Sequence, residues 1–178
     1  MSDIISNQNC TIRTADLKDA EALIEISNSI IYEGDYFIRV SEELDKESII
    51  QQKDQIQQIL NNEKETLIVA EINDVVVGSI EFRSHNLKRL SHTGTISISI
   101  SENYRGMGIG KNLLKAMLDW AENHPLIEKV SLGVFSTNHT AISLYKSMGF
   151  IEEGRKVKQF KIDENKYVDD ILMYKFVY

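Results

Sequence analysis

The stretch Arg105-Gly106-Met107-Gly108-Ile109-Gly110-Lys111 follows a predicted strand and opens a predicted helix, and it decides the fold. Glycine has no Cβ, so the three glycines of this turn let the backbone come close to a ligand. The first N–H groups of the helix have no partner within it and lie at the positive end of its dipole. We therefore expect residues 106–111 to form a cradle for phosphate, with Arg105 and Lys111 adding positive charge.

Two known phosphate-binding loops differ from this turn. A Walker A loop has four residues between its glycines and then Lys-Ser/Thr, whereas here three residues separate Gly106 from Gly110 and Asn112 replaces the hydroxyl that holds magnesium. A dinucleotide fingerprint has the spacing Gly-x-Gly-x-x-Gly, whereas the spacing here is Gly-x-Gly-x-Gly. A turn that only lets the helix pack closely is the remaining alternative.

Hydrophobic periodicity places the other elements around this turn. We expect a short strand at residues 11–14, a helix capped by Thr14 or Asp16, a loop at 33–40 and a second amphipathic helix at 45–60. A hairpin at 67–72 and 75–82 flanks Asn73-Asp74, and a strand at 95–101 alternates Ile with Ser or Thr. The remaining expected elements are a helix at 109–121, a strand at 129–135, a helix from the Asn138 cap to Gly149, and strands at 151–162 and 167–176.

This order, β-α-α-β-β-β-α-β-α-β-β, predicts a mixed α/β fold, a largely antiparallel sheet covered by helices. The 178 residues contain one proline and no Gly/Ser linker or repeat, so we expect residues 1–178 to be a single domain. Hydrophobic residues make up 42% of the chain and charged residues 26%, as in ordinary globular proteins.

Composition also limits the partners. No apolar run approaches the roughly 20 residues that span a bilayer, and residues 1–10 lack a secretion signal, so we expect a cytoplasmic protein without a membrane partner. The single cysteine, Cys10, excludes an internal disulfide and a cysteine zinc site, and we expect no metal. The net charge of −7, without a Lys/Arg run, argues against nucleic acid and is compatible with a cationic substrate. A homodimer is left open.

A second motif lies about thirty residues after the glycine turn. Residues 138–150 fit the pattern Asn-x-x-Ala-x-x-Leu/Phe-Tyr-x-x-x-Gly-Phe, and Arg105, Gly108 and Gly110 fit Gln/Arg-x-x-Gly-x-Gly/Ala. Together the two motifs closely resemble the GNAT N-acetyltransferase superfamily. The resemblance is specific from about residue 96 to 153, and it extends as an order of elements over roughly residues 12–174.

The resemblance implies acetyl-CoA as cosubstrate. The strand residues Ile98, Ser99 and Ile100 would pair with the pantetheine arm. The loop residues Arg105, Gly106, Met107, Gly108, Ile109, Gly110 and Lys111 would hold the pyrophosphate. Asn138 would contact the cofactor besides capping its helix, and the Tyr145 hydroxyl would protonate the departing thiolate; ordinary packing is the alternative for Tyr145.

The general base is where the chain departs from well-known relatives. Several of these carry a glutamate five residues before the asparagine, where this chain has Gly133, and others carry one near residues 92–95, where this chain has His-Thr-Gly-Thr. Glu81 and His92 are the remaining candidates, and a water chain is the alternative to both. The ordinary interpretation is that Glu81 is a solvated strand residue and that His92 is a loop residue.

The resemblance therefore implies an N-acetyltransferase, an acyltransferase whose acceptor is a small primary amine such as an amino acid, a polyamine or an aminoglycoside. Because no cysteine lies near the motifs, direct attack of the amine in a ternary complex is expected. One alternative is a protein N-terminal or lysine acetyltransferase. An alternative of another class is a catalytically silent CoA-binding sensor or interaction module.

Overall fold

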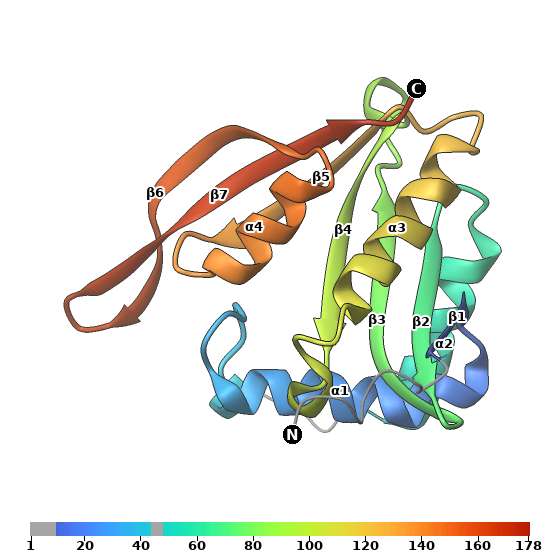
Figure 1. Cartoon of the computed structure of the whole chain (residues 1–178), viewed down its shortest axis with the longest axis horizontal. Helices are drawn as coiled ribbons and strands as arrows, with labels where there is room; N and C mark the ends of the chain where they lie inside the picture. Colours follow the sequence, from blue (N-terminus) through green and yellow to red (C-terminus); the bar gives the residue numbers. More distant parts are fainter. Residues whose placement is uncertain (1–9, 44–47) are drawn as a thin grey trace.

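Seven strands form one sheet in the computed structural model, which describes residues 10–43 and 48–178 (Figure 1). The strand order is β1-β2-β3-β4-β5-β7-β6. Neighbouring strands are antiparallel except β4 and β5, which are parallel. The strands are β1 (Cys10–Thr14), β2 (Thr66–Ile72), β3 (Val75–Ser84), β4 (Thr93–Ile100), β5 (Lys129–Phe135), β6 (Ile151–Asp163) and β7 (Lys166–Phe176). The predicted mixed fold and its order of strands and helices are confirmed.

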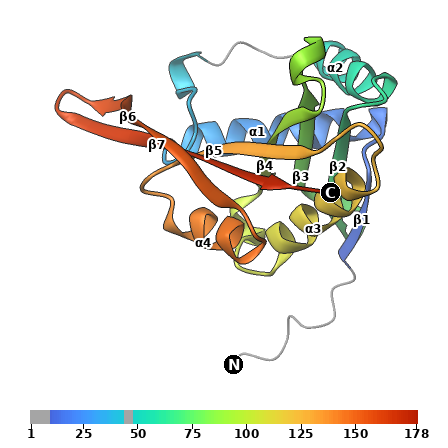
Figure 2. The ribbon, with the colours of Figure 1, turned by 90° about the horizontal axis from the view of Figure 1, so that it is seen from above.

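Within the described part of the chain, four α-helices cover the two faces of the sheet (Figure 2). They are α1 (Ala20–Glu33), α2 (Ile49–Asn61), α3 (Ile109–Glu122) and α4 (His139–Ser147). The main core lies between the sheet and α3 and α4, and includes Phe82, Leu113, Met117 and Phe150. A smaller core joins α1 and α2 to the other face. No helix among the described residues is long and apolar enough to cross a membrane.

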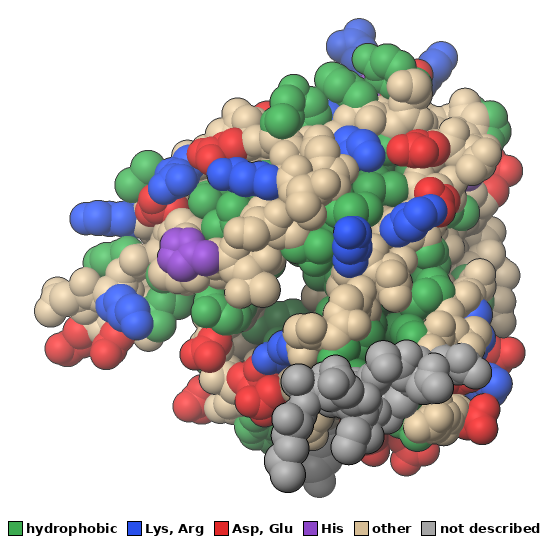
Figure 3. Space-filling view, viewed as in Figure 1, with side chains coloured by type: hydrophobic (Ala, Val, Ile, Leu, Met, Phe, Trp, Pro, Cys, Tyr) green, Lys and Arg blue, Asp and Glu red, His purple; other side chains and the backbone are tan. Residues whose placement is uncertain are grey.

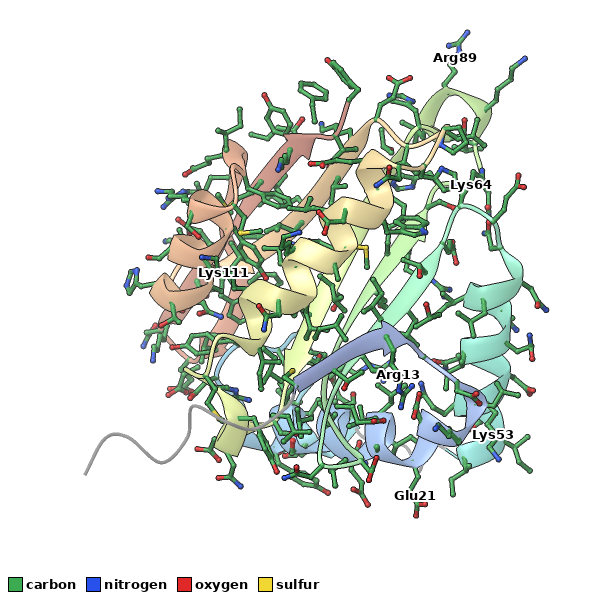
Figure 4. All side chains as sticks on the ribbon, turned by 45° about the vertical axis from the view of Figure 1, so that its right-hand side comes forward. Arg13, Glu21, Lys53, Lys64, Arg89 and Lys111 are labelled. Carbon is green, nitrogen blue, oxygen red and sulfur yellow. The ribbon has the colours of Figure 1, made fainter. Side chains whose placement is uncertain are left out.

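A helix cap and a group of ion pairs fix the start of α1. Asp16 caps a short 3-10 turn (Leu17–Asp19), and α1 follows it directly. Asp19 is 4% exposed and forms an ion pair with Arg13, which also pairs with Glu71 of β2 (Figure 4). Burial opposes ionisation of Asp19, but the hydrogen bonds from Arg13 and from the Asp16 N–H outweigh it and lower the Asp19 pKa. This network joins β1, β2 and the start of α1.

Several predicted boundaries differ from the structure, most by one residue and three by more. The predicted start of the second helix, at residue 45, lies outside the described residues, and the described helix begins at Ile49 with Ser48 as its cap. Strand β4 begins at Thr93, because its first residues pair with β5, a contact far apart in sequence. Strand β3 runs on to Ser84, opposite Gly94 of β4. Tertiary pairing lengthens both strands beyond their sequence pattern.

Candidate active site

The site lies where β4 and β5 diverge. These two strands pair only at 93–95 with 129–131, whereas β4 remains paired with β3 as far as Ile100. Residues 96–100 of β4 therefore have no strand partner on the β5 side among the described residues. Figure 3 shows an opening through the molecule at this place. We call the space between the diverging strands the wedge. Its β4 edge offers backbone N–H and C=O groups to an extended ligand.

The glycine turn joins the end of β4 to α3. Gly106 and Gly108 have φ angles of +76° and +81°, a region in which residues with a side chain are strained. A Cβ on either glycine would meet no heavy atom within 4 Å, so the space above the loop is open. The first bond of α3 runs from the Asn112 N–H to the Gly108 carbonyl at 3.1 Å. The N–H groups of residues 109–111 therefore have no intrahelical acceptor, and they fit the predicted phosphate cradle.

The remaining loop residues have different surroundings. Ile109 is 2% exposed, so it offers a ligand only its backbone, and Met107 packs partly against the main core. A Cβ on Gly110 would lie 3.2 Å from Ile100 Cδ1 and 3.3 Å from Leu144 Cδ2, so this glycine serves the close packing of α3. Lys111 is exposed on the first turn of α3, on the side nearer α4 (Figure 4).

Arg105 has a partner that the sequence did not indicate. Its guanidinium pairs with both carboxylate oxygens of Glu33, at the end of α1, with N–O distances of 2.5 and 2.9 Å. Its Nε donates to the Ile100 carbonyl at 3.0 Å. The charge predicted for the phosphate cradle is thus partly neutralised by Glu33. Arg105 also links the glycine loop to α1 on the other side of the sheet.

Helix α4 carries the second motif. Asn138 caps the helix, because its Oδ1 accepts the Ala141 N–H at 3.1 Å. Tyr145 is 6% exposed, and its ring packs against Phe150 with centroids 5.9 Å apart. Burial raises the pKa of Tyr145 to about 12, so its hydroxyl stays protonated at neutral pH. Among the described residues no fully shielded side-chain oxygen lacks a hydrogen-bond partner, so the hydroxyl is not a trapped polar group.

A polar pocket of about 340 Å³ lies on the other face of the sheet, beneath α1 and α2. Its lining contains Glu81 of β3 and Arg39, together with four serines and two glutamines. The full lining is Leu23, Ser27, Phe37, Arg39, Gln52, Gln55, Ile59, Leu67, Ser79, Glu81, Ser97 and Ser99. A volume of this size suits a small molecule.

Glu81 lies on β3, one strand away from the free edge of β4. Its neighbours across the sheet are Leu67 on β2 and Ser97 on β4. Burial raises the pKa of Glu81; the charge of Arg83 opposes this rise and that of Glu65 adds to it. A carboxylate in a poorly hydrated pocket gains from a cationic ligand, because the ligand replaces the missing hydration.

His92, the other candidate base, lies at the closed end of the wedge. Its carbonyl accepts the N–H groups of Glu128 and Lys129 at 2.9 and 3.2 Å, where β4 and β5 are still together. His92 does not line the pocket. Of the two candidates, therefore, Glu81 lies where an acceptor would enter. The catalytic role of either residue stays a prediction.

Sequence reasoning missed most of the pocket. Alternation in β4 turns Ile96, Ile98 and Ile100 toward the main core, so Ser97 and Ser99 face the pocket. This alternation is a usable signal, although the family resemblance assigns Ser99 only to the cofactor edge. Gln52 and Gln55 had no such signal, because glutamines also occupy exposed positions of α2. Arg39 comes from a loop whose path no local pattern fixes.

Comparison with known proteins agrees with this geometry. The Acetyltransferase (GNAT) family profile matches residues 30–150. The L-amino acid N-acetyltransferase AaaT of Escherichia coli is 29% identical over 106 residues, which are 60% of this chain and 65% of that protein. An N-alpha-acetyltransferase of Sulfurisphaera tokodaii is 30% identical over 89% of this chain and 86% of its own length. The spermidine N(1)-acetyltransferase of Vibrio cholerae is 24% identical over 94% of this chain and 93% of its own length.

Solved structures agree as well. A GNAT acetyltransferase from Streptococcus pneumoniae superimposes with a TM-score of 0.89 and 26% identity, covering 94% of this chain and 99% of that one. The fold also matches yncA, a putative acetyltransferase from Salmonella typhimurium solved with acetyl-CoA, with a TM-score of 0.84, 22% identity and coverage of 95% and 94%. The free edge of β4, the glycine cradle and the family match agree, and the chain belongs to the GNAT acetyltransferase family as an acetyl-CoA-dependent N-acetyltransferase.

Proposed function

We propose that this enzyme transfers the acetyl group of acetyl-CoA to a primary amine of a small molecule. The observation that carries the proposal is the polar pocket of about 340 Å³, in which Glu81 lies one strand away from the free edge of β4. A cationic amine held there would reach the wedge from the α1 and α2 face. The cofactor cradle at the start of α3 would supply the thioester from the other end of the wedge.

The cofactor would be held mainly by backbone groups. Residues 98–100 would pair with its extended arm, and the N–H groups of residues 109–111 would bind the pyrophosphate. Asn138 would contact the cofactor through its amide nitrogen, because its Oδ1 already accepts the Ala141 N–H in the helix cap. Acetyl-CoA supplies an activated acyl group, and no covalent enzyme intermediate is needed. Cys10 lies on β1, at the far edge of the sheet.

Acetyl transfer to an amine has three steps that the protein must assist. An amine with a pKa of about 10 arrives charged and must lose a proton before it attacks. The carbonyl oxygen gains negative charge, which an N–H of the free β4 edge can stabilise. The thiolate then takes a proton, and Tyr145 is the proposed donor because its hydroxyl remains protonated up to a pKa of about 12.

Among small amines, the pocket favours an acceptor that carries a negative group as well as an amine. Glu81 suits the ammonium group, and Arg39 in the same lining suits a carboxylate. An amino acid has both groups, whereas a polyamine has only the cations. The amino acid acetyltransferase activity of the Escherichia coli relative is consistent with this choice.

A protein N-terminus is the second candidate acceptor. It is favoured by the Sulfurisphaera tokodaii relative, an N-alpha-acetyltransferase that is 30% identical over most of both chains. A peptide would place only its terminal residue in the pocket. Its α-amino group has a pKa near 8, so it needs less help in losing its proton.

The test is turnover of acetyl-CoA with a panel of amines, measured as release of free thiol. The panel contains amino acids, spermidine, an aminoglycoside and short peptides with a free N-terminus. We expect the highest kcat/KM with an amino acid. Turnover with peptides alone would favour the second candidate. Binding of acetyl-CoA without turnover of any amine would contradict the proposed function.

A further inference from the structure

A second carboxylate stands beside the wedge, on the β5 wall. Asp170 lies on β7 opposite Phe135 of β5, and it is 8% exposed. A Cβ on Gly133 would lie 2.7 Å from Asp170 Oδ1. The carboxylate of Asp170 therefore reaches from β7 over the backbone of β5. It occupies the space that a side chain at position 133 would take.

Asp170 faces the acceptor side of the sheet. Val130, Leu132 and Val134 of β5 point into the main core, so Gly133 and the carboxylate above it lie on the opposite face. Glu81 lies on that face too, because its neighbours Ile80 and Phe82 point into the main core.

The two carboxylates also stand at the same level of the wedge. The last paired residues of its two walls are Thr95 and Ser131. Two residues beyond these, Ser97 lies on the β4 wall and Gly133 on the β5 wall. Ser97 is the partner of Glu81 in the β3–β4 pair. Glu81 in the pocket and Asp170, which lies outside the pocket lining on the other wall, thus stand on opposite sides of the opening through which an acceptor amine would reach the thioester.

Asp170 keeps its acceptor capacity, unlike its neighbour. Asp169 Oδ1 accepts the Lys158 N–H at 2.7 Å, and its Oδ2 pairs with Arg155 at 3.4 Å, so Asp169 is committed to the β6–β7 hairpin. Lys156 of β6 faces Asp170 and forms an ion pair with it, with Nζ 3.6 Å from Oδ2, which is too long for a hydrogen bond. No fully shielded oxygen among the described residues lacks a partner, so the Asp170 oxygens remain accessible.

On the basis of the proposed function, we infer that Asp170 is the catalytic base that accepts the proton of the acceptor amine. Glu81 then holds the positive charge of the incoming ammonium in the pocket. The ammonium gives one proton to an Asp170 oxygen, the N–C bond forms and the C–S bond breaks. The nitrogen loses its second proton to water, and the thiolate gains one from Tyr145. Asp170 passes its proton to water, and Tyr145 is reprotonated from solvent.

The first test replaces Asp170 with asparagine in the full chain. General base catalysis is worth about 10²- to 10⁴-fold, so Asp170→Asn should lower kcat by that order with little change in KM. The loss should shrink as the pH approaches about 10, because the amine then arrives neutral. Lys156→Met is the matched control: it removes the facing cation and leaves the carboxylate. If both variants lose the same activity with the same pH profile, Asp170 serves only an ion pair.

A carboxylate swap makes the test independent of local packing. Asp170→Ala combined with Gly133→Glu places a carboxylate over β5 from the other strand, in space that Asp170 has vacated. We expect this double variant to recover activity and the wild-type pH profile relative to Asp170→Ala alone. If Asp170→Asn fails to fold, as measured by thermal unfolding, the double variant decides. A folded double variant no better than Asp170→Ala overturns the inference.

A failure of the role inferred for Asp170 can be told apart from a failure of the proposed function. If wild-type protein acetylates no amine in the panel, the proposed function fails before any variant is compared. If the wild type turns over an amine and folded Asp170→Asn keeps its kcat and pH profile, only the role of Asp170 is lost.

Discussion

The face of the sheet that carries α3 and α4 and the face that carries α1 and α2 are built in different ways. The first contains the main core, and its proposed ligand groups are backbone atoms of β4 and of the first turn of α3. The second has a smaller core and a polar pocket lined by side chains from α1, α2 and three strands. Backbone groups recognise a cofactor whatever the neighbouring side chains are. Side chains give each protein its own acceptor pocket, and so the two faces should respond differently to substitution.

Gly108→Val is the change expected to damage the cofactor face most. A left-handed φ costs a residue with a side chain about 1–3 kcal/mol, and the branched side chain would enter the open space that we propose for the pyrophosphate. We expect acetyl-CoA binding to become unmeasurable by calorimetry in a folded protein. Gly34→Val is the control, since Gly34 also has a positive φ, +73°, and open space around it, but lies outside the cradle. Unchanged affinity in Gly108→Val would remove the cradle from the site.

Tyr145→Phe tests whether the buried end of α4 contributes chemistry or only packing. The variant keeps the ring contact with Phe150 and removes the hydroxyl alone. We expect kcat to fall by roughly 10- to 10³-fold, with acetyl-CoA affinity little changed. Because the pKa of Tyr145 is about 12, its hydroxyl stays protonated between pH 7 and pH 10. Loss of the Tyr145 proton should therefore not lower the activity of the wild-type enzyme in this range. A wild-type kcat in the variant would reduce Tyr145 to a packing residue.

Glu81→Gln tests the acceptor face. A charge-assisted hydrogen bond is worth about 1.5–3 kcal/mol, so kcat/KM for a cationic amine should fall by about 10-fold or more, chiefly through KM. Acetyl-CoA affinity should not change. His92→Gln is the comparison, and we expect its pH profile to match the wild type. If instead either variant loses kcat near neutral pH and recovers it near pH 9 to 10, that residue is the base and Asp170 is not.

The same Glu81 variant carries a stability prediction with a defined sign. Burial raises the pKa of Glu81, so the folded protein binds this proton more tightly than the unfolded chain. Stability from this group therefore falls as the pH rises from the ordinary glutamate pKa through the raised one. Glu81→Gln should remove that dependence and leave the protein at least as stable at pH 7 by thermal unfolding. If Glu81→Gln is less stable than the wild type at pH 7, the ionised Glu81 carboxylate stabilises the folded protein without a ligand.

The smallest effect is expected where the two faces are joined, at the ion pair between Arg105 and Glu33. Exposed ion pairs contribute about 0.2–1 kcal/mol, so Glu33→Gln should tighten acetyl-CoA binding by no more than about 2- to 5-fold, because the Arg105 charge is released toward the phosphates. Arg105→Met should weaken it by a similar factor. The difference should diminish in high salt. If both variants bind acetyl-CoA with equal affinity, Arg105 serves only to hold α1 in place and does not contribute to the cradle.

The sequence by itself determined the cofactor half of this protein. The glycine turn, the alternating strand before it and the motif from Asn138 to Phe150 are each local, because a helix start, a free strand edge and a helix cap are built from consecutive residues. Local periodicity was likewise enough to give the order of the strands and helices. The strand ends that it misplaced by two residues, such as the start of β4 at Thr93, are set by pairing with other strands.

Only the tertiary structure decided the acceptor half. Sequence reasoning found that Gly133 carries no carboxylate, but the side chain that covers it comes from Asp170, thirty-seven positions later and on the neighbouring strand. Arg105 meets Glu33 across 72 positions of sequence in the same way. Such contacts depend on strand register and on the angle at which β4 and β5 part. Both follow from the packing of the whole sheet, and no run of neighbouring residues encodes them.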